Sequence, residues 1–262
     1  MNVTRLFTTS DLAAGVEAPL DEAQAHYLRH VMRRGEGAPL SLFNGRDGEW
    51  KATLSLRGKK AAIALVEAQT KAQTVEPDLW LCFAPVKRAR IDYIAEKATE
   101  LGVSVLQPIV TQHTAVERVN VERLRANAVE AAEQTERLTV PEVRAPVDLG
   151  RLLDEWPAGR RLLMCDETGG GPPIGETLAA LDDSARAAPW AIVVGPEGGF
   201  ASAELAALRR IKDVTAVGLG PRILRADTAA LAALAVWQAL AGDWRRSTPR
   251  LSADYRTSRD AV

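Results

Sequence analysis

The sequence contains few of the residues on which disulfide-stabilised and metal-binding proteins depend. Among its 262 residues there are two cysteines, Cys82 and Cys165, and each lies inside an apolar run. That setting indicates small buried side chains and argues against a disulfide or a metal role. Of the three histidines, His26 and His30 have the spacing of a metal pair on a helix, but no third ligand stands near them. We therefore expect no disulfide framework and no metal.

Long apolar runs and an excess of charge of either sign are missing as well. No run is long enough to span a bilayer, and the first twelve residues lack the apolar core of a signal peptide. We therefore expect a cytoplasmic protein without a membrane partner. The 33 basic and 34 acidic residues leave a net charge of −1, so any contact with RNA must come from local basic clusters. Such clusters occur at Arg29, Arg33 and Arg34, at Lys87, Arg88 and Arg90, and at Arg245, Arg246 and Arg250.

What the sequence does contain is a strand, a glycine loop and a helix, repeated twice within residues 190–240. The first apolar run ends in the loop Gly195–Gly199, and we expect Ser202 to cap the helix that follows. The second run ends at Gly220, before a helix rich in Ala and Leu that begins near Arg225. Units of this kind predict a parallel α/β sheet, in which ligands bind at the carboxyl ends of the strands.

The letters of the two glycine loops do not match a phosphate-binding motif. The dinucleotide fingerprint is absent, and so is the P-loop lysine with its hydroxyl neighbour. Glu197 would also repel a phosphate that approached the next helix N-terminus. A ligand with hydroxyl groups, an aromatic base and positive charge fits better. The alternative is a tight turn that needs positive φ at Gly198 or Gly199.

These loops resemble a known family. The run Gly195–Phe200 together with the run Leu219–Ala229 resembles the RsmE family of ribosomal RNA methyltransferases, within the SPOUT superfamily. Three further stretches resemble the family pattern, namely Lys97 with Glu100, the following Leu-Gly-Val, and Glu133-Gln134 with Arg137. The chain departs from that pattern in two places, because Asp227 replaces a glutamate and residues 111–114 replace a Ser/Thr-Glu-Arg run.

The resemblance implies an α/β fold in which an N-terminal PUA-like β-barrel precedes a SPOUT domain with a C-terminal deep trefoil knot. Short alternating runs broken by turn signals are themselves typical of a small barrel. The polar segment 70–78 is expected to be a linker. We therefore divide the chain into a barrel over residues 1–74, a methyltransferase domain over residues 75–246 and a polar tail over residues 247–262.

For the SPOUT domain the resemblance implies S-adenosylmethionine as the cofactor. It places the pocket at the two glycine loops and at the end of the strand that contains Cys165. Glycines let the backbone approach a ligand closely, and Leu219 and Leu224 offer apolar walls. The residues expected to bind the cofactor are Cys165, Gly195, Pro196, Glu197, Gly198, Gly199, Leu219, Gly220, Ile223, Leu224, Arg225 and Thr228.

The implied reaction is methylation of N3 of a uridine in 16S rRNA. N3 carries a proton that must leave, and negative charge then develops on the base oxygens. Arg225 does not act as a base and suits the stabilisation of that charge. Asp227 and Glu133 are carboxylates that can take the proton, and the sequence does not choose between them. The target base must be unpaired or flipped out, because N3 lies on the Watson–Crick edge.

The resemblance also implies the small (30S) ribosomal subunit as a partner and a homodimer, for which the helix Thr228–Leu240 offers an apolar face. Three alternatives stay open: a SPOUT methyltransferase for another RNA such as tRNA, a non-catalytic RNA-binding module, and a nucleotide-binding α/β protein. The residues expected to contact RNA are Arg5, Arg29, Arg33, Arg34, Lys87 and Arg88.

Overall fold

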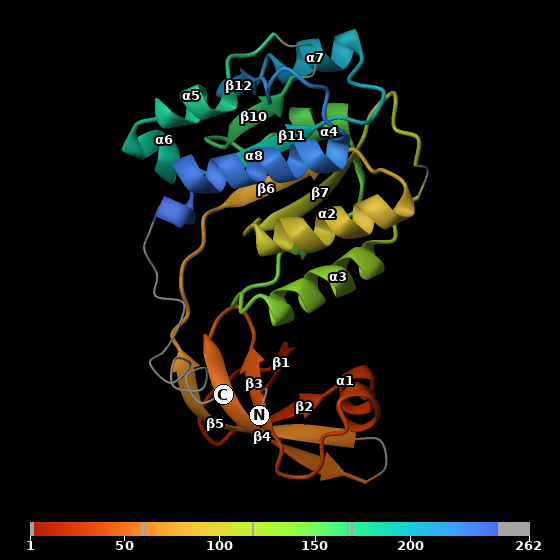
Figure 1. Cartoon of the computed structure of the whole chain (residues 1–262), viewed down its shortest axis with the longest axis vertical. Coiled ribbons are helices and arrows are strands. Elements are labelled where there is room, and N and C mark those ends of the chain that lie inside the picture. Colours follow the sequence, from red (N-terminus) through yellow and green to blue (C-terminus); the bar gives the residue numbers. More distant parts are fainter. Residues whose placement is uncertain (1–2, 59–60, 117, 167, 169, 246–262) are drawn as a thin grey trace, which may run out of the picture.

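The computed structural model describes residues 3–58, 61–116, 118–166, 168 and 170–245. These residues form two sheets, each with a hydrophobic core of its own (Figure 1). The smaller sheet uses residues up to Lys71, and the larger one begins at Leu79. The predicted polar tail over residues 247–262 lies outside the described residues.

The N-terminal sheet contains five strands in the order β1-β3-β4-β5-β2, in which only the β1–β3 pair is parallel. Alternate residues of these strands are buried, as expected for a sheet with one face on a core and one in water. The core of this sheet is mostly leucine and alanine. Its strands are β1 (Thr4–Phe7), β2 (Glu17–Leu20), β3 (Pro39–Phe43), β4 (Glu49–Arg57) and β5 (Ala61–Lys71).

The helix expected over residues 21–33 is present but not uniform. It begins as α1 (Glu22–His26), where Asp21 accepts from the backbone N–H of Gln24 in a capping box. It continues as a π-helical turn, η1 (Tyr27–Val31). Leu28 is fully buried against the sheet, and this contact fixes the helix on it.

The second sheet is parallel throughout, with the order β12-β10-β11-β6-β7-β8 and with β9 paired to β7. The central strands have almost no polar residues because helices cover both of their faces. The strands are β6 (Leu79–Phe83), β7 (Val105–Val110), β8 (Glu142–Val143), β9 (Val147–Asp148), β10 (Arg161–Cys165), β11 (Trp190–Val194) and β12 (Val214–Val217).

Two hydrophobic clusters divide the helices between the faces of this sheet. One cluster joins Trp190 and Ile192 to α2 (Arg88–Glu100), α3 (Val121–Gln134), α5 (Ile174–Ala179) and α8 (Ala226–Leu240). The other joins Ala191 and Val193 to α4 (Leu149–Asp154) and α7 (Ser202–Leu208). The short elements α6 (Asp183–Ala187) and η2 (Asp243–Arg245) complete the domain. The result is an α/β fold, as predicted, in which the parallel sheet lies between two layers of helices.

One local expectation was wrong, and the free apolar face of α8 is smaller than expected. Ser202 does not cap α7, because the helix begins there and Ala201 is the cap residue, whose N–H donates to the carboxylate of Glu204. The apolar face of α8 is largely used within the chain. Trp237 is buried and packs edge-on against Trp190 with ring centroids 6.4 Å apart.

Within the described part of the chain, no helix has the length and apolar character that a membrane span requires. The same residues contain no group of three or more His, Cys, Asp or Glu side chains arranged to hold a metal ion.

Candidate functional site

The carboxyl ends of three neighbouring strands meet at one edge of the second sheet. β10 lies between β12 and β11, so the segments that follow these strands converge there. The backbone also ties them together, because Gly218 donates to the carbonyl of Pro172 at 2.9 Å and accepts from Ile174 at 3.1 Å. A Cβ added at Gly171 would lie 2.7 Å from the backbone of Val217, so only glycine permits this approach.

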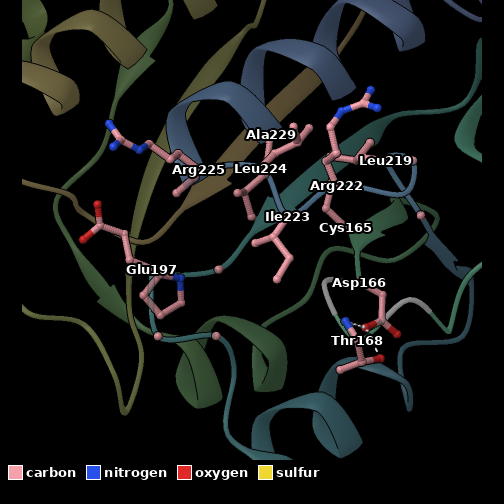
Figure 2. A pocket seen from close by; sticks show the side chains of 18 of the residues that line it. Cys165, Asp166, Thr168, Glu197, Leu219, Arg222, Ile223, Leu224, Arg225 and Ala229 are labelled. Atoms are coloured by element: carbon pink, nitrogen blue, oxygen red, sulfur yellow. Dashed lines mark hydrogen bonds between the residues drawn. The ribbon is translucent and has the colours of Figure 1, made fainter.

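These segments enclose a cavity of about 850 Å3 (Figure 2). That volume is typical of a site for a small organic ligand. Its lining comes from the end of β10, from the loop after β11 and from the loop and first helical turns after β12. The lining residues are Cys165, Asp166, Thr168, Val194, Gly195, Pro196, Glu197, Gly198, Gly199, Gly218, Leu219, Gly220, Pro221, Arg222, Ile223, Leu224, Arg225, Ala226 and Ala229.

One wall of the cavity carries a buried carboxylate. The Asp166 side chain is 1% exposed, and it accepts from the backbone N–H of Thr168 at 2.9 Å and from the Thr168 hydroxyl at 2.6 Å. Arg209 lies 3.0 Å from its other oxygen. Burial raises the pKa of Asp166, but these donors outweigh burial and hold it below the usual range. A fixed negative charge therefore faces the cavity next to Cys165, whose buried thiol has its pKa raised to about 12.

The rim on the opposite side carries charged groups (Figure 2). Glu197 and Arg225 lie there, at the two glycine loops, and both are exposed. Arg90 of α2 reaches this rim, with its Nη1 2.6 Å from Glu197 Oε1 and its Nε 3.8 Å from Asp227 Oδ2. Positive and negative side chains therefore alternate around the mouth of the cavity.

Geometry requires glycine at more than one position of the site, and Gly199 has the positive φ, +74°, that was considered for the first loop. A Cβ at Gly195 would lie 2.8 Å from the ring of Phe200, a buried residue of the core beneath this sheet edge. Gly220 has a φ of +103° in the second loop, a conformation that other residues rarely adopt.

The structure brings nearly all of the predicted cofactor residues together at this cavity. The exception is Thr228, which is exposed and does not line it. Ala226 and Ala229 line the cavity instead, because residues three apart share one helix face, whereas Thr228 lies on another face of the helix. Asp166 and Thr168 also line the cavity and were not among the predicted site residues. Their position directly after an apolar strand was a signal that could have identified them.

The three predicted catalytic residues separate into different places. Arg225 lines the cavity as the cap residue of α8. Asp227 lies beside it, outside the lining, and is paired with Arg90. Glu133 is at the junction of the two sheets, where its carboxylate accepts from the backbone N–H of Phe7 at 2.9 Å. Within this chain, the prediction that Glu133 acts at the cofactor site was wrong, because α3 ends against the N-terminal sheet.

Arg5 does not have the RNA-binding role that was predicted for it. Its side chain is 9% exposed and forms an ion pair with Glu49 at 2.7 Å. It also donates to the carbonyls of Ala132 and Arg137 at 2.5 Å and stacks on the ring of Phe43. Arg5 therefore joins the N-terminal sheet to α3 and the segment after it, and it is not available to RNA phosphates.

The other predicted RNA contacts differ in their exposure. Arg33 and Lys87 are exposed. Arg29 is half-buried and donates to the carbonyls of Gly58 and Ala61, while Arg34 donates to the hydroxyl of Thr4. The side chain of Arg88 lies outside the described part of the chain. The N-terminal sheet thus presents Arg33 to solvent and uses Arg29 and Arg34 in its own fold.

Two family models match the chain. The RNA methyltransferase domain matches residues 74–238, and the RNA methyltransferase PUA domain matches residues 20–67. The first match contains every residue that lines the cavity. The second lies within the N-terminal sheet and α1.

Curated relatives and solved structures agree with these matches. The chain is similar to the ribosomal RNA small subunit methyltransferase E of Rickettsia conorii, with 31% identity over 90% of this chain and 95% of the relative. The protein of the same name from Synechocystis is 32% identical over 90% of this chain and 77% of the relative. The structure of that methyltransferase from Neisseria gonorrhoeae, bound to S-adenosyl methionine, covers 93% of this chain and 100% of its own, with 27% identity and a TM-score of 0.80.

Proposed function

Because the chain belongs to the RNA methyltransferase family that these domain models describe, we propose that it uses S-adenosylmethionine to methylate N3 of a uridine in 16S rRNA. The observation that carries this proposal is the cavity at the ends of β10, β11 and β12, whose lining is rich in glycine, apolar side chains and carboxylates. Relatives that are named for methylation of small-subunit ribosomal RNA support the choice of substrate.

The residues of the cavity fit this cofactor. All five residues of Gly195–Gly199 line the cavity, and the three glycines among them have no side chain to separate their backbone from a ligand. Leu219 and Leu224 supply apolar surface for an adenine. Asp166 and Glu197 offer carboxylate oxygens to ribose hydroxyls or to a cationic group. When bound, S-adenosylmethionine supplies an electrophilic methyl group on a sulfonium.

The charged rim supplies the remaining chemistry. Arg225 keeps its positive charge at any ordinary pH, so it can stabilise charge on a uracil oxygen as the N3 proton leaves. Asp227 is the nearer of the two predicted carboxylates and is our candidate acceptor for that proton. We expect Arg225→Ala to lower turnover by roughly a hundredfold, as for the loss of an oxyanion donor. Binding of the cofactor is expected to change far less.

We further propose a homodimer, a small-subunit substrate, a cytoplasmic location and a trefoil knot at the two glycine loops. The resemblance to the SPOUT superfamily supports the dimer and the knot. Sedimentation that gives only monomer at micromolar concentration would refute the dimer. A ribosomal substrate supports the cytoplasmic location.

The experiment that tests the proposed function is transfer of a tritiated methyl group to purified small subunits, to free 16S rRNA and to tRNA. We expect label in 16S rRNA, recovered after nuclease digestion as 3-methyluridine. Label in tRNA alone would favour another RNA substrate. RNA binding without transfer would favour a non-catalytic module.

A further inference from the structure

The loop after β11 is held weakly by its own backbone. Within Gly195–Gly199 the described hydrogen bonds include a single internal one, from the N–H of Gly199 to the carbonyl of Pro196 at 3.0 Å. Glycine loses more conformational freedom on ordering than any other residue, and this loop contains three glycines. Interactions from outside the loop must therefore keep it in the conformation that encloses the cavity.

Two side chains from the other half of the sheet contact this loop. Arg90 comes from α2 and pairs with the Glu197 carboxylate at 2.6 Å. His113 comes from the segment after β7, and its Nδ1 lies 2.9 Å from the carbonyl oxygen of Gly199. His113 also packs on Gly198, since a Cβ built there would lie 3.2 Å from the Cβ of His113. Neither Arg90 nor His113 lines the cavity.

The segment that carries His113 is itself fixed. Thr111 and Thr114 close it as a turn, in which the N–H of Thr111 donates to the Thr114 hydroxyl at 2.9 Å. The N–H of Gln112 donates to the carboxylate of Glu204 on α7 at 2.8 Å. His113 therefore projects from an ordered base, which a residue that positions a flexible loop requires.

The partner of His113 determines its tautomer. A carbonyl oxygen only accepts, so the proton of a neutral ring must lie on Nδ1. A positively charged ring keeps the same Nδ1–H, so this hydrogen bond persists in both charge states. Charged groups on the elements that it contacts include the carboxylates of Glu197 and Glu204 and the guanidinium of Arg90.

We propose that Arg90 and His113 are positioning residues that clamp the loop Gly195–Gly199 in its cofactor-binding conformation. This inference rests on the proposed function, because it assigns the loop to S-adenosylmethionine. The clamp acts by preorganisation: the loop is ordered before the ligand arrives, so binding loses less conformational entropy. It also links the loop to α2 and to the segment after β7, which lie outside the cofactor-binding segments.

His113 offers a matched set of variants for calorimetric titration with S-adenosylmethionine. His113→Ala removes one hydrogen bond and is expected to weaken affinity about three- to tenfold. His113→Asn places an amide N–H where Nδ1 stood, so its affinity is expected within about twofold of the wild type. His113→Asp presents an acceptor to the carbonyl of Gly199 and is expected to bind more weakly than the alanine variant.

The pH dependence separates positioning from proton transfer. The asparagine variant keeps an N–H donor for the Gly199 carbonyl but has no group that can transfer a proton. Turnover of the asparagine variant is expected to keep the wild-type pH profile. Loss of one limb of that profile would overturn the proposal in favour of an acid–base role for His113.

Arg90 is tested in the same assay. Arg90→Ala is expected to weaken affinity about three- to tenfold. The double variant with His113→Ala is expected to lose less than the product of the two single effects, since either loss already loosens the loop. Arg123→Ala is the matched control, because Arg123 of α3 also forms an ion pair with α2, at 2.5 Å from Asp92, and its described partners are not in the loop.

The outcomes distinguish the clamp from the proposed function. A wild-type protein that binds no S-adenosylmethionine contradicts the proposed function itself. The clamp alone is overturned if the wild type binds S-adenosylmethionine and the folded Arg90→Ala and His113→Ala variants bind it with unchanged affinity. Thermal unfolding of each variant shows that its fold is intact, and His113 is exposed, so its loss leaves the core unchanged.

Discussion

Substitution of Gly220 by alanine isolates the backbone contribution of the second glycine loop. Gly220 has a φ of +103°, and a Cβ built on it has no atom within 4 Å. The substitution therefore adds no clash and acts through φ alone. Holding a residue other than glycine at positive φ costs about 1–2 kcal/mol. An alanine at this position is expected to relieve the strain by moving the ligand-free loop out of this conformation, so that binding must restore it. At 1.4 kcal/mol per factor of ten, the affinity for S-adenosylmethionine is then expected to be about 5- to 25-fold weaker.

Calorimetric titration measures this change, and Gly15→Ala is the matched control. Gly15 has a φ of +84° with no atom within 4 Å of a built Cβ, and it lies in the N-terminal sheet domain. The control variant is expected to lose a similar free energy of unfolding while it keeps its affinity for the cofactor. Equal affinities of the wild type and Gly220→Ala would refute the reasoning, because the cavity would then not depend on the loop conformation described here.

Three further predictions concern the N-terminal sheet and its junction with α3. Arg5→Ala removes the closer of the two cations beside the buried carboxylate of Glu49, which keeps only Lys71 at 3.7 Å, and it leaves the carbonyls of Ala132 and Arg137 without this donor. Urea unfolding is expected to show a loss of about 3–5 kcal/mol. Arg46→Ala, which breaks an exposed pair, is expected to cost at most about 1 kcal/mol. Burial raises the pKa of Glu133, although the N–H of Phe7 and the guanidinium of Arg5 lower it. The stability that this shift contributes is fully present at pH values below the usual glutamate range. It is lost as the pH rises through the raised pKa. Glu133→Gln is therefore expected to raise the free energy of unfolding near neutral pH, with the gain shrinking on acidification, and a gain that is independent of pH would contradict burial as the cause. Arg33 has an exposed side chain and a φ of 51°, which suits glycine, so Arg33→Gly is expected to leave the free energy of unfolding unchanged. The slope of log RNA affinity against log salt concentration is expected to fall by about one phosphate contact. An unchanged slope would exclude Arg33 as an RNA contact.

The sequence by itself determined the elements of this protein and the loops that form its cavity. Runs such as Trp190–Val194 are apolar at every position, which only a strand covered on both faces tolerates. Glycines directly after such strands mark places where the backbone turns sharply or approaches a ligand. These signals are local, because a strand and its following loop are adjacent in the chain. They located the two glycine loops, and the family resemblance carried by the same stretches implied the twelve cofactor residues. Eleven of these line the cavity, and Thr228 is the exception.

Only the tertiary structure decided which distant segments join those loops. The order of the strands places β10 between β12 and β11, and this pairing brings Asp166 to the cavity beside loops that follow it by about thirty and fifty residues. Docking of α3 on the N-terminal sheet buries Arg5 and removes Glu133 from the cofactor site. The identity of a charged residue does not reveal whether its side chain is exposed to water or paired with a buried carboxylate. Its role is therefore set by long-range packing, which no local pattern of the sequence records.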